Sequence, residues 1–174
     1  IHVPININIS GNVKSGDIKI SQIKGSINLV TQSLDATLKN ISGNIILKNN
    51  GGNIDLEKVN GQIDLNVISG HVSLSKCDGN ITINTENGNN TLSSIKGEIN
   101  SATTLGETSV ENFVGTKATF NINVGNLRLS NCNANIDAKI DIGDIKIDKV
   151  NGNTNLYTAK GFINVKNIIG DNIA

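Results

Sequence analysis

The sequence predicts an all-β fold, a single-stranded parallel β-helix or β-solenoid, and three observations carry this prediction. Glycine recurs every nine residues through most of the 174-residue chain. Apolar and polar residues alternate after each glycine, and a second apolar position recurs every 18 residues. Self-similarity at a fixed period is typical of stacked repeats. We therefore expect about nine coils of about 18 residues, each made of two unequal nine-residue halves.

The first 15 residues fit the repeat least well. Ile5, Ile7 and Ile9 alternate with asparagines, which indicates a strand laid on the first coil. Terminal repeats need such a cover, because an open sheet edge recruits other chains. We expect a capping strand within 1–15 and the repeat domain over 16–174.

Within the repeat domain, each unit reads Gly-x-apolar-x-apolar, as at 16–20 and 143–147. This alternation is typical of a strand with one buried face. The glycine usually follows Asn, Ser, Asp or Lys, and such pairs mark tight corners at which glycine adopts a positive φ without steric cost.

The 18-residue period distinguishes a solenoid from an antiparallel meander of nine-residue strand–turn units. A meander does not require the apolar column that recurs seven residues after alternate glycine positions. Coil winding is expected to be right-handed, by analogy with parallel crossover connections. The column consists of Ile23, Ile41, Val59, Cys77, Ile95, Phe113, Cys132, Val150 and Ile168.

The middle coils contain an irregularity. Asn90 and Thr108 take consecutive positions in an inward ladder, and Ser101 replaces an aliphatic residue nearby. One extra residue also lies between Gly115 and Gly125. Two interpretations stay open here, a β-bulge with locally satisfied hydrogen bonds or a distorted site that binds a ligand.

Charge and hydropathy exclude two classes of partner. The 15 basic and 15 acidic residues cancel, so the chain has no long-range field to attract nucleic acid. No apolar run approaches the ~20 residues of a membrane-spanning helix, so we expect no membrane insertion by this chain.

The two cysteines are predicted to be free, buried and inert. Cys77 and Cys132 are three coils apart in one column, hence ~14 Å apart at the usual strand spacing, too far for a disulfide. The two histidines, His2 and His71, are expected on the surface without partners at metal-ligand spacing. We therefore expect no metal, no cofactor and no catalytic residue.

Carboxylates are numerous on the outward positions, and some polysaccharide-cleaving enzymes are β-helices. A carbohydrate-active enzyme is thus an alternative, which needs a cleft with paired carboxylates. The corners of about four residues leave little chain to build such a cleft. Calcium β-rolls also use nine-residue units, but only 50–55 approaches their glycine pattern.

Two surface features indicate interactions. Tyr157 and Phe162 fall at outward positions in a chain with 2% aromatic residues. Two interpretations stay open for them, a candidate interface or packing under a further C-terminal segment. No cap is evident after Gly170, which makes end-to-end self-association through an open solenoid end a second functional hypothesis.

The repeat resembles the bacterial adhesin-like domains of unknown function, including the head domain named after its Gly-Ile-Asn motif. The units at 15–20, 42–47, 69–74 and 151–156 carry this resemblance, reading SGDIKI, SGNIIL, SGHVSL and NGNTNL. The resemblance implies a non-enzymatic adhesin or structural scaffold. It implies an extracellular or cell-envelope location in a bacterium and a protein or glycan surface ligand. It supplies no functional residues.

Overall fold

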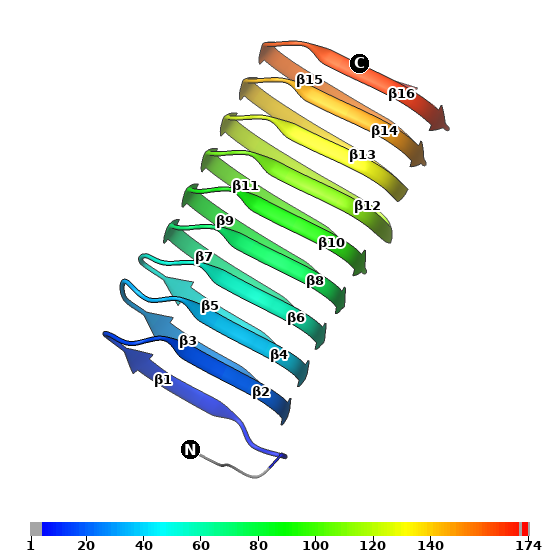
Figure 1. Cartoon of the computed structure of the whole chain (residues 1–174). Coiled ribbons are helices and arrows are strands. Elements are labelled where there is room, and N and C mark those ends of the chain that lie inside the picture. The colour runs from blue at the N-terminus through cyan, green and yellow to red at the C-terminus, as the bar shows by residue number, and fades with distance from the viewer. Residues whose placement is uncertain (1–4, 171, 174) are drawn as a thin grey trace.

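The computed structural model describes residues 5–170 and 172–173, and it shows an all-β parallel solenoid of about nine turns (Figure 1). No described residue lies in a helix. The predicted fold class and the coil of about 18 residues are confirmed. His2 and the other residues of 1–4 lie outside the described part.

The described residues form seventeen strands. β12 and β13 are longer than the others because each continues through a corner. The strands are β1 (Ile9–Val13), β2 (Ile18–Lys24), β3 (Ile27–Thr31), β4 (Ala36–Ser42), β5 (Ile45–Asn49), β6 (Ile54–Asn60), β7 (Ile63–Ser69), β8 (Val72–Asp78), β9 (Ile81–Asn87), β10 (Asn90–Lys96), β11 (Ile99–Leu105), β12 (Thr108–Val124), β13 (Leu127–Ile142), β14 (Ile145–Asn151), β15 (Thr154–Lys160), β16 (Ile163–Ile169) and β17 (Asn172–Ile173).

Each strand pairs in parallel with the equivalent strand of the next coil. β4 pairs with β6 and β5 pairs with β7, so that Leu38 lies beside Leu56 and Leu47 beside Leu65. The pairs build two walls, which Figure 1 shows stacked along the solenoid axis. One wall holds β2 to β10 (even numbers), β14 and β16. The other holds β1 to β11 (odd numbers), β15 and β17, and β12 and β13 contribute to both.

The core lies between the two walls. The predicted apolar column is buried from Ile23 to Val150, and Ile168 packs against the core with partial exposure. Each buried aliphatic side chain contributes roughly 1.5–3 kcal/mol through its removal from water. Stacking of equivalent residues therefore stabilises every coil through its two neighbours.

The N-terminal segment follows the same repeat. β1 pairs with β3 in the usual register, with Ile9 beside Ile27. The side-chain oxygen of Asn8 accepts a hydrogen bond from the backbone N–H of Ser26, 18 residues on. Residues 5–13 thus take the position of half a coil.

The extra residue lies at the start of the interval that the sequence indicates. Lys96 pairs with Val114, but Ile99 pairs with Ala118, and the register shifts between Val114 and Lys117. The corner around Gly115 therefore holds one more residue than the corners below and above it. Its coil supplies both phenylalanines of the core, Phe113 and Phe120.

Glycine closes both corners of most coils. Gly79 has φ +147°, and a Cβ atom there would lie 2.1 Å from the carbonyl oxygen of Gly61 in the preceding coil. Its backbone N–H donates a 2.8 Å hydrogen bond to Lys96 in the following coil. The backbones of neighbouring coils are therefore too close for any side chain at this position.

A further bend lies within one strand of each coil and is made by a non-glycine residue in the left-handed region. This residue inserts an extra step between two inward positions, so that Leu92 and Ile95 are both buried although they are three residues apart. We call these the left-handed residues. They are Gln22, Asn40, Lys58, Lys76, Ser94, Asn112, Asn131, Lys149 and Asn167, with φ between 52° and 60°.

Replacement of Ser94 by asparagine should stabilise the protein. Ser94 has φ 56°, which costs most L-residues roughly 1–2 kcal/mol, whereas asparagine tolerates this region better. We expect a gain of about 0.5 kcal/mol in the free energy of unfolding, measured by urea denaturation. Ser93→Asn, at the neighbouring position in β10, is the matched control and should give no gain. A loss of stability in Ser94→Asn would contradict the argument.

Candidate functional site

The residues of the sequence-predicted irregular site are all in the interior. Asn90, Ser101 and Thr108 are each 1% exposed or less. Asn90 accepts a hydrogen bond from Thr85 (2.9 Å) and donates one to Thr103 (2.9 Å), whose hydroxyl lies 3.3 Å from that of Thr108. We call these four residues, Thr85, Asn90, Thr103 and Thr108, the interior polar network.

Ser101 lies outside this network. Its hydroxyl has no hydrogen-bond partner, the one such buried side-chain oxygen or nitrogen among the described residues. Ser101 pairs with Phe120 in the next coil, and Phe120 pairs with Ala138 in the coil after that. A phenyl ring thus stacks between two small side chains, which explains why a small residue occupies a position that is aliphatic in earlier coils.

Both cysteines are free and buried, as predicted. Burial raises the pKa of the Cys77 thiol and raises that of Cys132 to about 11. Each Sγ lies 3.5 Å from a backbone carbonyl two residues earlier in its own strand. A raised pKa disfavours the thiolate, which is the reactive form.

The Cys132 thiol should make stability fall at alkaline pH. Its folded-state pKa of about 11 exceeds the unfolded value of about 8.5. Its contribution is therefore complete below about pH 8.5 and is lost as pH rises toward 11, because the unfolded chain releases the proton first. We expect this thiol to account for about 2 kcal/mol of the decline, measured by urea denaturation across this range. Cys132→Val, the residue found at Val59 and Val150 of the same column, should decline less. Parallel curves for the two proteins would contradict the assignment.

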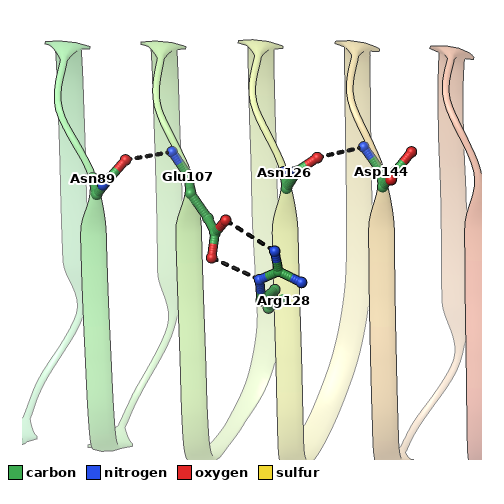
Figure 2. Close-up of polar contacts among 5 residues, drawn as sticks. All are labelled: Asn89, Glu107, Asn126, Arg128 and Asp144. Carbon is green, nitrogen blue, oxygen red and sulfur yellow. Dashed lines mark hydrogen bonds and ion pairs between the residues drawn. The ribbon is translucent and has the colours of Figure 1, made fainter.

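Polar side chains form a hydrogen-bonded ladder along the corner that precedes β8, β10, β12, β13 and β14. Asn89 accepts from the backbone N–H of Glu107 (2.8 Å), and Asn126 accepts from that of Asp144 (2.8 Å), as Figure 2 shows. His71 is exposed, as predicted, and takes part through Nδ1, which accepts from the N–H of Asn89. This ladder ties neighbouring coils together where the chain leaves the sheet.

One position of the ladder carries an ion pair as well. The Glu107 carboxylate accepts two hydrogen bonds from the guanidinium of Arg128, at 2.7 and 3.2 Å (Figure 2). This contact raises the pKa of Arg128 further. Both side chains are substantially exposed, so the pair adds little to stability.

A concave feature lies on the outer side of the odd-numbered wall. It has a volume of about 410 Å³ and follows β5, β7, β9, β11 and the end of β12. Its sides are formed by alternate residues of these strands, with the intervening residue facing the core. We call it the amide groove. Its outward lining residues are Lys48, Asn50, Asn66, Ile68, Asn84, Glu86, Ala102, Thr104, Asn121 and Asn123.

The two candidate interface residues are exposed, but they occupy different columns. Tyr157 is 54% exposed and projects from β15, in the column that contains Lys139 and Asn121. Phe162 is 80% exposed and lies at the corner before β16, where its N–H donates to Asp144. Tyr157 therefore continues one side of the amide groove.

The groove was not predicted from the sequence. Its asparagines are spread over β5 to β12 and look like ordinary polar positions of half-buried strands. The groove can be found by comparing residues one coil apart. Asn66 and Asn84 are 18 residues apart, as are Asn50 and Ile68. Reading outward positions by column brings these residues together.

Metal-binding clusters and membrane-spanning helices were sought among the described residues. Within them, no group of three or more His, Cys, Asp or Glu side chains is placed to hold a metal ion. In the same part of the chain, no helix has the length and hydropathy to cross a membrane.

No family model, curated protein or solved structure matches the chain. The fold and the geometry of its surfaces therefore carry the functional argument.

Proposed function

We propose that the protein is a non-enzymatic, rigid binding module or scaffold of the cell envelope. The observation that carries this proposal is the continuous parallel ladder, which aligns outward side chains in straight columns along the solenoid. Such a surface presents outward side chains repeatedly at a fixed spacing of about 4.8 Å. Repeated presentation suits attachment to an extended or repetitive ligand.

The repeat motif supports the envelope location. Units such as SGDIKI at 15–20 resemble bacterial adhesin-like domains, for which surface exposure and adhesion are implied. The close corners support rigidity, because glycines such as Gly79 bring neighbouring backbones into direct contact.

The proposal is tested in the organism that encodes the protein. An antibody against this chain should label intact cells, while an antibody against a cytosolic marker labels them only after permeabilisation. A strain that lacks the gene should attach less well to its natural surfaces, and the full-length gene should restore attachment. Labelling of the chain only after permeabilisation would contradict the envelope location.

A second candidate function is assembly through the C-terminal coil. Ile163 and Val165 of β16 occupy inward columns, yet they are 36% and 39% exposed, against 0% and 1% for their partners Ile145 and Ile147 in β14. An additional strand on β16 would cover them, and β-edges are natural sites for strand addition.

Sedimentation velocity over a wide concentration range tests this candidate. We expect the chain to self-associate as concentration rises, and Val165→Lys to remain monomeric, because it places a charge on the surface to be covered. Asn164→Lys, which adds the same charge at an outward position of β16, is the matched control and should still associate. A strictly monomeric parent chain would contradict the candidate.

A further inference from the structure

We propose that the amide groove binds an extended, neutral, β-linked glycan chain that runs along the solenoid axis. This inference rests on the proposed function as a surface-binding module, and it names the ligand class and the face that binds it.

The shape of the groove favours a linear ligand. Its lining comes from five successive strands of one wall, β5, β7, β9, β11 and β12, so it extends over about 19 Å at the usual strand spacing. The rise of one sugar along an extended β-linked chain is close to the spacing between neighbouring strands. A chain of about five sugars would therefore meet two outward side chains at each step.

The polar groups of the groove match sugar hydroxyls. An asparagine amide offers two N–H donors and a carbonyl acceptor, and each sugar hydroxyl donates and accepts as well. The amides are also held in place, because Asn84 donates to Asn66 across one coil (3.1 Å) and Asn66 donates to Asp64 (3.1 Å). Fixed amides lose less conformational entropy when a ligand binds.

Apolar groups in the same groove match the C–H faces of a sugar ring. Ile68 is 46% exposed and Ala102 is partly exposed, and both line the groove. Binding sites for small molecules combine apolar contact area with a few placed polar groups in this way.

The charges in the groove favour a neutral glycan. Lys48 and Glu86 are its two charged lining residues, and their formal charges cancel. A polyanionic chain gains no net attraction from this surface, since the whole chain also has a formal net charge of zero.

An aromatic ring lies further along the same column. Asn121 pairs with Lys139, which pairs with Tyr157, so Tyr157 is two coils beyond the C-terminal end of the groove. Its ring is 54% exposed. An aromatic side chain with an apolar body and a hydroxyl is well suited to contact a sugar that leaves the groove.

Calorimetric titration of the whole chain with defined oligosaccharides tests the proposal. The probes are cellohexaose and chitohexaose, each with its trisaccharide, and α-linked maltohexaose and hexagalacturonate for comparison. We expect one of the β-linked hexasaccharides to bind at least tenfold more tightly than its trisaccharide. Asn66→Ala/Asn84→Ala should weaken this binding at least tenfold. Asn155→Ala, an exposed asparagine on the same wall that bonds to Asp137, is the matched control and should bind normally.

Circular dichroism melts of the variants separate loss of binding from loss of folding. Absence of binding by both β-linked hexasaccharides, equal affinity for hexa- and trisaccharides, or tighter binding of hexagalacturonate or maltohexaose would each overturn the proposal. The proposed function is tested separately, by surface labelling and attachment of cells. Failure of this inference is therefore distinguishable from failure of the proposed function.

Discussion

Replacement of Gly79 by alanine should lower the free energy of unfolding by about 3–5 kcal/mol, the range found when backbone strain and steric overlap combine. The new Cβ would lie 2.1 Å from the Gly61 carbonyl oxygen and 2.6 Å from its carbon, so the backbone of one coil must move. A positive φ of 147° adds a conformational cost that glycine does not have. Urea denaturation followed by far-UV circular dichroism measures the loss.

Two other glycines separate the steric cost from the conformational cost. Gly16 has φ +89° with nothing within 4 Å of an added Cβ, so Gly16→Ala should cost only about 1–2 kcal/mol. Gly11 has neither a positive φ nor a contact closer than 4.0 Å, and Gly11→Ala should change stability by less than about 0.5 kcal/mol. Equal losses at Gly79 and Gly16 would show that the close approach of neighbouring coils does not matter.

Replacement of Asn90 by alanine should cost about 2–4 kcal/mol. Its amide accepts from Thr85 and donates to Thr103, and both threonines are buried. Removal of the amide leaves two buried hydroxyls without these partners and also leaves a cavity. Urea denaturation gives the change in free energy.

Removal of the whole interior polar network is the informative comparison. The variant Thr85→Val/Asn90→Leu/Thr103→Val/Thr108→Val keeps the side-chain volumes close to the original and leaves none of the four groups unpaired. It should lie within about 1 kcal/mol of the parent protein, because replacement of all partners by apolar groups is nearly neutral. If it loses as much stability as Asn90→Ala, the network stabilises by more than satisfying its own buried groups.

The coil was predictable because glycine period and apolar alternation are both visible along the chain. The column from Ile23 to Ile168 distinguished the solenoid from a meander, and its members from Ile23 to Val150 are buried. The free state of Cys77 and Cys132 followed from their separation within one column.

The left-handed residues were not predictable in the same way. Lysine, serine, glutamine and asparagine all occupy this column, and outside asparagine none of them marks a positive φ. The constraint comes from the coil geometry, which must bring Leu92 and Ile95 to the same side. The sequence shows only the result, an inward spacing of three residues where two would continue the strand.

The candidate sites divide between interior and surface. Asn90 and Thr108 lie on neighbouring rungs of an inward ladder, as predicted, and their polar groups bond to other core residues. Tyr157 is exposed, as predicted, yet its relation to Asn121 appears only when the outward residues are read by column. The amide groove is lined by outward side chains from several neighbouring strands. The sequence of one strand alone therefore does not reveal it.

The register of strand pairing has a consequence for how such a protein changes over evolutionary time. Each coil contacts only the coils before and after it, and equivalent residues such as Leu38 and Leu56 are one full turn apart. Duplication or deletion of a gene segment that encodes one whole turn would join the chain at equivalent positions of two coils. The remaining strands would keep their register. Each such event would lengthen or shorten the rod by about 4.8 Å and lengthen or shorten its outer columns by one side chain. The reach of the molecule is thus adjustable in small increments by ordinary genetic recombination, without redesign of its interior.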